Sequence, residues 1–219
     1  MRFSLTANGL SLASWVNYTT LYSGFDISAG GDGAKTIYVE FSDKAGNLSN
    51  PKASDTTSYD TTPPSTGTIA FQTSTGYTNL LTINLLVSSI GAGFMKIAAT
   101  EQGLDIAEWI NYSTTYLNHA LDTSSEGTKY IYAAFKDQAG NIQSNHASGS
   151  VVYDITVPDT QITNNPPAVT RKIKGSFSFT STENNTSFYC KIDSGSYALC
   201  TSPFVTAALS DGNHVFTVY

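Results

Sequence analysis

The chain has 219 residues, of which 40% are hydrophobic and 12% aromatic, so it can fill several small cores and is not a disordered protein. Its net charge of −6 and its 11 scattered basic residues argue against a nucleic-acid-binding surface, which needs Lys and Arg gathered on one face. No run of apolar residues approaches the roughly eighteen that a membrane-spanning helix requires.

The predicted elements are strands and linkers with one exception. In chain order we expect a linker at 59–64, a strand at 79–87, a helix at 104–112, a strand at 129–135, a linker at 153–158 and strands at 176–180 and 214–219. The strands are predicted from alternating apolar residues or from aromatic and β-branched runs. The linkers are expected to be extended because residues before proline are driven out of the helical region.

An internal repeat organises the first two thirds of the chain. Residues 1–66 align without a gap with residues 95–160, and roughly 26 of the 66 positions are identical. A unit of this length is a whole small domain. The second copy begins near Pro63 and the first has no counterpart of its opening part, so we expect Met1 to lie inside a truncated domain. The predicted domains are a truncated repeat at 1–62, a complete repeat at 63–157 and a C-terminally truncated domain of a second type at 158–219.

Gly, Asn, Asp and Ser clusters separate the predicted strands at short spacing, as they do in β-sandwiches. The fold class predicted from the strands and the repeat is therefore all-β, with tandem β-sandwich domains joined by short Pro-containing linkers.

Two cysteines, Cys190 and Cys200, flank a turn-forming segment at 193–196. At this spacing they fit opposite ends of a β-hairpin, where cross-strand distances suit a disulfide. A structural disulfide would place the chain in an oxidising compartment. The alternative is two buried thiols that act as small apolar side chains.

The residues that recur in the repeat carry a family resemblance. Met95, Trp109, Tyr112 and the motif 137–141, followed by Pro158, resemble the bacterial immunoglobulin-like (fibronectin type III-like) tandem repeats of large secreted or cell-surface proteins. The cysteine-containing third segment resembles a second bacterial immunoglobulin-like subtype. The resemblance implies immunoglobulin-like sandwiches that act as stalks, spacers or adhesive modules, and it implies architecture more strongly than activity.

Four aspartates are candidate calcium ligands: Asp43, Asp60, Asp137 and Asp154. Asp43 and Asp137 begin the repeated motif Asp-(Lys/Gln)-Ala-Gly-Asn, whose carboxylate and amide oxygens suit a hard cation. Each motif has one carboxylate, so a hairpin turn in which Asp bonds to the turn backbone is the preferred interpretation. Asp60 and Asp154 stand at expected domain junctions, where other immunoglobulin-like arrays bind calcium. We expect no cofactor, with calcium as the alternative.

Two aromatic pairs are candidate ligand contacts: Trp15 with Tyr18, and Trp109 with Tyr112. Aromatic faces stack on sugars, but aromatic residues kept in register in both copies are explained more simply by packing in a core or a loop. Exposure of the two indoles separates the interpretations, because a buried indole cannot stack on a sugar.

The sequence offers no catalytic constellation. His119, His146 and His214 do not recur between the copies, and neither a Gly-x-Ser-x-Gly nor a His-Glu-x-x-His motif is present. We therefore expect a protein that is not an enzyme.

The leading functional hypothesis is a structural spacer or stalk of a bacterial extracellular or cell-surface protein. The alternative is an adhesive module that binds glycans or host or prey surface proteins through its loops. A second alternative is an accessory domain of a secreted polysaccharide-degrading enzyme. The expected partners are glycans or cell-surface proteins and neighbouring immunoglobulin-like domains, with neither nucleic acid nor membrane insertion.

Overall fold

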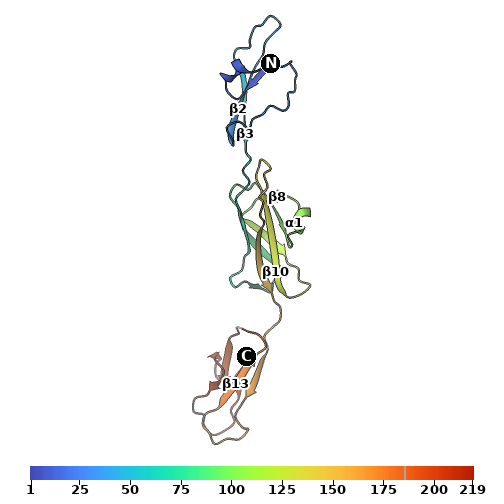
Figure 1. The fold of residues 1–219 in the computed structure, drawn as a ribbon. Helices are drawn as coiled ribbons and strands as arrows, with labels where there is room; N and C mark the ends of the chain where they lie inside the picture. The colour runs from blue at the N-terminus through green and yellow to red at the C-terminus, as the bar shows by residue number, and fades with distance from the viewer. Residues whose placement is uncertain (185) are drawn as a thin grey trace. The chain divides into compact units, whose positions relative to one another are not determined.

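The computed structural model describes residues 1–184 and 186–219, and nearly all of its regular elements are β-strands (Figure 1). The all-β prediction is confirmed. Contacts divide the chain into two compact units, Met1–Asp154 and Ile155–Tyr219. Within the described residues, no helix is long and apolar enough to cross a membrane. The boundary between the units falls inside the predicted linker 153–158, whereas the further division of the first unit between residues 62 and 63 stays a prediction.

The first repeat folds as a single three-stranded antiparallel sheet in the order β1-β2-β3. Its elements are β1 (Arg2–Ser4), the 3-10 helix η1 (Gly9–Leu12), β2 (Gly33–Glu40) and β3 (Ala53–Tyr59). The chain between η1 and β2 forms no strand.

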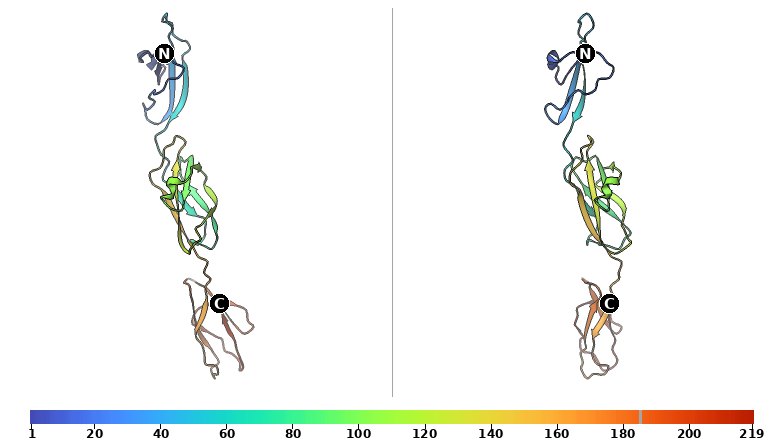
Figure 2. Two further views of the ribbon diagram at one scale, coloured as in Figure 1. Left: turned by 90° about the vertical axis from the view of Figure 1, so that its right-hand side faces the viewer. Right: turned by 45° about the vertical axis from the view of Figure 1, so that its right-hand side comes forward.

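The second repeat contains two sheets, in the orders β5-β11-β10-β7-β8 and β4-β6-β9. Its elements are β4 (Thr68–Phe71), β5 (Tyr77–Thr78), β6 (Thr82–Ser88), β7 (Phe94–Ala98), α1 (Gly103–Ile106), β8 (Ile110–Asn111), β9 (Thr115–Ala120), β10 (Gly127–Lys136) and β11 (Ala147–Tyr153). Apolar residues from both sheets form one buried cluster, so the sheets face each other across a shared core (Figure 2). The immunoglobulin-like identity of this arrangement stays a prediction.

The central sheets of the two repeats have the same register. Phe3 pairs with Val39 in the first repeat, and Ile97 pairs with Ala133, at the corresponding positions, in the second. The edge strands agree as well, since β2 pairs with β3 from Gly33 opposite Tyr59 and β10 pairs with β11 in the equivalent way. The repeated sequence therefore specifies the same three strands in both copies.

The two copies differ in what covers that sheet. In the second repeat, β4 and β6 pack on it, and the side chain of Phe135 is 0% exposed. Phe41, at the corresponding position in the first repeat, is 37% exposed. Counterparts of β4 and β6 do not occur among the described residues of the first repeat, where Tyr22 and Phe25 pack against Phe3 of the sheet instead.

The predicted helix 104–112 is wrong over most of its length. The structure has one helical turn, α1, at Gly103–Ile106, and Ile110–Asn111 form the edge strand β8 instead. A four-residue helix has little stability of its own, so packing decides the conformation of the following residues. Leu104 is the one buried residue of α1.

The second unit has two small sheets, in the orders β12-β13-β16 and β15-β14-β17. Its strands are β12 (Thr160–Asn164), β13 (Ser176–Ser181), β14 (Phe188–Ile192), β15 (Ala198–Cys200), β16 (Phe204–Val205) and β17 (Phe216–Val218). Phe179 is buried between them and meets Phe188 edge-on at 4.9 Å between ring centroids, while Phe177 stacks on Phe216 at 4.1 Å. The predicted strand 214–219 is shorter than expected, because β17 begins at Phe216 and ends at Val218.

The structure contains a disulfide between Cys190 and Cys200, with a Cα–Cα distance of 5.8 Å. The two residues lie on paired strands, where Cys190 is opposite Ala198 and Cys200 is opposite Phe188. They are thus diagonal neighbours on one face of the hairpin.

One glycine sets how closely the two sheets of the second repeat approach. A Cβ atom at Gly149 on β11 would lie 2.5 Å from the carbonyl oxygen of Ile69 on β4. The first repeat has Asp55 at the corresponding position, where no strand crosses and the side chain is exposed. We predict that Gly149→Asp lowers the free energy of unfolding of the second repeat by about 2 to 3 kcal/mol, because it forces apart a packed interface.

This loss is measured by urea unfolding followed through Trp109 fluorescence, with Trp15 replaced by Phe so that one indole reports. The reverse exchange in the first repeat, Asp55→Gly, is the control and should leave the Trp109 transition unchanged. An unaltered midpoint in Gly149→Asp would show that β4 does not press on β11.

Candidate functional site

The segment that connects the two repeats is held by side chains from both of them. On the side of the first repeat, the Asp32 carboxylate accepts hydrogen bonds from the Thr61 amide at 3.0 Å, the Thr61 hydroxyl at 2.8 Å and the Thr62 hydroxyl at 2.6 Å. On the side of the second repeat, the Asn141 side-chain amide donates to the Asp60 carbonyl at 3.0 Å. We call residues 60–62 with Asp32 and Asn141 the joint.

Hydrogen bonding in the joint also favours the charged form of the Asp32 carboxyl group. The Thr62 and Thr61 hydroxyls donate to Asp32 and hold the pKa of this carboxyl below its ordinary value. The Asp60 carboxylate accepts from the Thr62 amide at 3.0 Å, which closes a local turn within the connecting segment. A carboxylate that accepts several donors fixes each of them more firmly than a neutral acceptor would.

The repeated motif 43–47 and its copy 137–141 form turns, the interpretation preferred from the sequence. Asp43 accepts from the Ala45 and Asn47 amides, and the Asn47 side chain donates to it at 2.8 Å. Asp137 accepts from the amides of Gly140 and Asn141 at 2.8 and 2.9 Å. The two glycines of the motif have positive φ angles, 88° at Gly46 and 100° at Gly140, which explains why glycine stands there.

These hydrogen bonds lower the pKa of the carboxyl groups of Asp43 and Asp137. The pKa of Asp43 is lowered, chiefly by the Asn47 side chain and amide. Removal from water raises the pKa of Asp137, but hydrogen bonds from Asn141 and Gly140 outweigh it and leave the pKa below its ordinary value. The second turn therefore has the same chemistry as the first in a less exposed place.

The four calcium candidates are placed in three different surroundings. Asp43 and Asp137 are occupied by turn donors, and Asp60 lies in the joint, where Asn141 connects it to Asp137. Asp154 follows β11, and its amide donates to the Thr78 carbonyl at 3.0 Å. Among the described residues, no group of three or more His, Cys, Asp or Glu side chains could hold a metal ion. A calcium role for these residues stays a proposal without a donor cluster behind it.

Both tryptophans lie on the surface beside cations, outside the buried cluster. The Arg2 guanidinium carbon lies 4.6 Å from the centre of the Trp15 ring, and Trp15 is 45% exposed. Trp109 is partly exposed and has two ammonium groups near its ring, Lys96 at 5.0 Å and Lys136 at 4.7 Å. Trp15 is therefore not part of a buried core, and both rings lie against cations at the surface, while the choice between packing in a loop and ligand contact stays a prediction.

The two tyrosines of these pairs lie in different environments. Tyr112 packs against the buried cluster, meets Phe135 edge-on at 6.1 Å, and its hydroxyl accepts from the Ser89 amide at 3.0 Å. Tyr18 meets Phe41 in the same way, at 6.1 Å, but it is 69% exposed. The contact between the tyrosine and phenylalanine rings therefore occurs in both repeats. It packs against the buried cluster in the second repeat and is exposed in the first.

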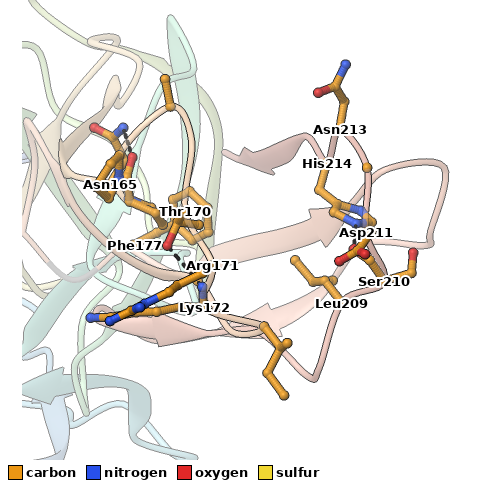
Figure 3. Close-up of a pocket in the computed structure, with 16 residues that line it drawn as sticks. Asn165, Thr170, Arg171, Lys172, Phe177, Leu209, Ser210, Asp211, Asn213 and His214 are labelled. Atoms are coloured by element: carbon orange, nitrogen blue, oxygen red, sulfur yellow. Dashed lines mark hydrogen bonds between the residues drawn. The ribbon is translucent and has the colours of Figure 1, made fainter.

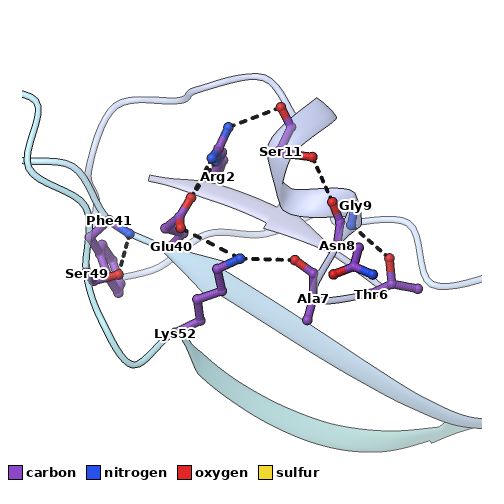
Figure 4. Close-up of polar contacts among 10 residues, drawn as sticks. All are labelled: Arg2, Thr6, Ala7, Asn8, Gly9, Ser11, Glu40, Phe41, Ser49 and Lys52. Carbon is purple, nitrogen blue, oxygen red and sulfur yellow. Dashed lines mark hydrogen bonds and ion pairs between the residues drawn. The ribbon is translucent and has the colours of Figure 1, made fainter.

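A buried carboxylate, Glu40, pairs with the Arg2 side chain that lies over Trp15, and Figure 4 shows the Arg2–Glu40 pair. Glu40 is 4% exposed and accepts from two Arg2 nitrogens, at 2.8 Å from Nε and 2.6 Å from Nη2. Lys52 lies 3.9 Å away and also donates to the Ala7 carbonyl. A buried charge is tolerated when it is paired in this way, and Arg2 is thereby held over the indole ring.

The second unit has a groove of about 490 Å³ between the loops 165–175 and 209–214 (Figure 3). Arg171 and Lys172 lie on one side of it and His214 on the other. The His214 ring is fixed, because Nδ1 lies 2.8 Å from the Asp193 carboxylate and Nε2 lies 3.0 Å from the Ser210 carbonyl. Both ring nitrogens face acceptors, an arrangement that favours the charged form of His214, in which both nitrogens donate.

Sequence patterns pointed to part of the joint and missed the rest. Asp60 and the Asn-containing motif were identified, but the contact between them was not. Asp32 and Thr62 escaped notice, although the repeat carries the signal: Glu126 and Thr156 stand at the corresponding positions.

No family model and no curated protein matches the chain. Among solved structures, the chain is similar to a tetra-tandem repeat in the extending region of a large adhesion protein, with 15% identity, 90% of this chain and 54% of that chain covered, and a TM-score of 0.34. It is also similar to a Ca²⁺-stabilized adhesin with which an Antarctic bacterium binds ice, with 15% identity, coverage of 87% and 56%, and a TM-score of 0.35. A third likeness is dimeric latent PorU from Porphyromonas gingivalis, with 14% identity, coverage of 89% and 21%, and a TM-score of 0.28.

The chain spans about half the length of the first two of these structures. With TM-scores of 0.35 or lower, the likenesses establish neither a family nor a function for this chain. The contacts within the chain therefore carry the functional proposal.

The Asp193–His214 pair gives the second unit a pH dependence. The Asp193 carboxylate, followed by the Ser210 carbonyl, raises the pKa of His214 above its ordinary value of 6.5, and His214 with the Val215 amide lowers the pKa of Asp193. Stability from charged His214 is fully present below about pH 6.5 and is lost as pH rises through the raised pKa. Stability from Asp193 is lost only as pH falls through its lowered pKa.

We predict that an NMR titration of the His214 ring gives a pKa above 6.5 and that Asp193→Asn lowers it toward that value. Asp211→Asn, close to His214 in the chain, is the control and should leave the titration in place. An ordinary His214 pKa in the unaltered chain would show that the pair does not form in solution.

Proposed function

We propose that the chain is a non-catalytic structural spacer, built from repeats whose connecting segment is held at both ends. The observation that carries the proposal is the joint: Asp32 of the first repeat and Asn141 of the second bind adjacent residues of the same short segment. A spacer needs such a contact, because repeats joined by an unheld linker change direction freely.

The strength of the joint follows from the number and type of its hydrogen bonds. Asp32 accepts three hydrogen bonds as a charged acceptor, the stronger kind, and the Asp60 carbonyl accepts one from Asn141. The contacts also continue beyond the joint, since the Ser65 amide donates to the Ile90 carbonyl and the Ser89 hydroxyl donates to the Ser65 carbonyl. The connecting segment is thus held at residues 60–62 and again at Ser65.

The disulfide supports a location outside the cytoplasm. Disulfides persist in oxidising compartments, and Cys190–Cys200 closes a hairpin in the second unit. The proposed location is therefore extracellular or at the surface of a bacterial cell, and the proposed partners are further repeats of the same protein.

The spacer role predicts a fixed geometry across the joint. Spin labels on cysteines introduced at the exposed residues Thr57 and Ser148 report on the first and second repeat. We predict a narrow distance distribution by pulsed EPR in the unaltered joint, and a broad one when Asp32→Ala and Asn141→Ala are combined, because both anchors of the segment are then removed.

Matched controls exist for both substitutions. Asp26 accepts from Ser28 in its own loop, and Asn47 occupies the place of Asn141 in the first repeat. Asp26→Ala with Asn47→Ala should keep the narrow distribution. A broad distribution in the chain with an intact joint would contradict the spacer role.

A second candidate function is adhesion, and the exposure of Trp15 favours it. One face of this ring is taken by Arg2, yet 45% of the side chain is open to solvent. Such a ring can stack on a sugar, with a cation beside it to orient a polar ligand.

The adhesive alternative is tested by a glycan-array and whole-cell binding screen. If Trp15 binds a glycan, Trp15→Ala should reduce binding at least about tenfold, the loss expected when a stacking aromatic anchor is removed. Trp109→Ala is the matched control, because Lys96 and Lys136 already occupy the surroundings of that ring. Equal loss in both variants, or no binding by the unaltered chain, would count against this function.

A further inference from the structure

The outer face of the small sheet β15-β14-β17 in the second unit carries exposed tyrosine rings. Tyr189 on β14 is opposite Leu199 on β15, so their side chains lie on the same face of the sheet. Lys191 lies on this face as well, because side chains alternate along a strand. Tyr197 joins them from the segment before β15, since the Lys191 ammonium group lies 4.6 Å from the centre of its ring. We call Tyr189, Lys191, Tyr197 and Leu199 the tyrosine platform.

The two rings of the tyrosine platform are connected through the ring of Tyr219. This ring lies nearly parallel to that of Tyr189, at 5.6 Å between centroids, and meets that of Tyr197 edge-on at 4.7 Å. Tyr189 is 39% exposed and Tyr197 is 41% exposed, so part of each ring is open to solvent. Aromatic rings in a row on a strand surface suit an extended ligand that offers flat apolar faces of its own.

The strands that carry the tyrosine platform are joined covalently on the opposite face of the hairpin. Cys190 follows Tyr189 on β14 and Cys200 follows Leu199 on β15, and the two cysteines form the disulfide. Because the disulfide keeps the two strands together, Tyr189 and Leu199 stay opposite each other. The platform is therefore formed before a ligand arrives, which lowers the entropic cost of binding.

Lys191 gives the tyrosine platform a positive charge, and it has no ion-pair partner among residues 1–184 and 186–219. Asp193 is the one acidic residue between positions 188 and 200. Its carboxylate lies 2.8 Å from the His214 ring and accepts from the Val215 amide at 2.7 Å. The Lys191 ammonium group is therefore left for a carboxylate that the ligand brings, beside rings that the same ligand can contact.

We propose that the tyrosine platform binds a polysaccharide built from uronic acids. The sugar rings lay their C–H faces on the exposed parts of Tyr189 and Tyr197, and a sugar carboxylate pairs with Lys191. A neutral sugar uses the rings of the platform alone, and an acidic peptide uses its charge alone, whereas a polyuronate uses both. The site is independent of the spacer role and of Trp15, because its residues lie in the second unit.

The test is isothermal titration calorimetry of the whole chain with polygalacturonate oligosaccharides at low ionic strength, where saturable binding is expected. The fully methyl-esterified oligosaccharide keeps the sugar rings without their charge and should bind roughly threefold more weakly, as for loss of one exposed ion pair. Polyglutamate of equal length keeps the charge without the rings and should bind roughly tenfold more weakly, because it forms no stacking contact.

Variants of the tyrosine platform assign the binding to its residues. Tyr197→Ala should weaken polygalacturonate binding roughly tenfold, because it removes one stacking ring, and Tyr197→Phe should keep most of the affinity. Lys191→Gln should abolish the preference for polygalacturonate over its methyl ester. Tyr130→Ala is the matched control, because it removes a tyrosine that is 55% exposed on β10 of the other unit, and it should leave binding unchanged.

Absence of binding by the unaltered chain overturns the proposal. Equal affinity for polygalacturonate and its methyl ester, or for polygalacturonate and polyglutamate, does so as well, and so does an equal loss in Tyr130→Ala and Tyr197→Ala. An unchanged amide NMR spectrum outside the platform shows that Tyr197→Ala is folded, and if it is not, the surface variant Lys191→Gln decides. Trp15→Ala should leave polygalacturonate binding intact, which separates this site from the adhesive alternative.

Discussion

Burial of one face of the β7-β10-β11 sheet is the constraint on which the second repeat depends. A sheet of this size is stable when an apolar face is covered, and here β4 and β6 supply the cover. The close approach needs glycine at two points, Gly67 over Phe135 and Gly149 under Ile69. The first repeat keeps the same strands and register without that cover, and its apolar residues remain partly exposed.

The Asp-x-Ala-Gly-Asn turn combines a local and a long-range task. Its aspartate accepts hydrogen bonds from the turn backbone, and its asparagine donates one side-chain N–H to that aspartate. The second N–H is thereby aimed outward, where Asn141 binds the connecting segment. An amide with two donors in a fixed plane is suited to this double role at Asn141.

The surface of the first unit uses cations and aromatic rings together. Arg2 lies between Trp15 and the buried Glu40, whereas Lys96 and Lys136 lie beside Trp109. The second repeat has Ala134 in the place of Glu40, and Lys96, which corresponds to Arg2, donates to the Leu104 carbonyl instead. The same scaffold thus offers an exposed indole in one copy and an indole flanked by two ammonium groups in the other.

Local patterns were enough to predict strands in four places, the Asp-x-Ala-Gly-Asn turns and the pairing of Cys190 with Cys200, because each depends on residues close in sequence. The repeat was found by aligning the chain with itself. The helix at 104–112 failed since so short a segment takes the conformation that its packing imposes. The joint could not be read from the sequence, because Asp32 and Asn141 reach residues 60–62 from about 30 and 80 positions away. The exposure of Trp15 and Phe41 likewise depends on the tertiary structure, because it is set by the strands that cover the sheet.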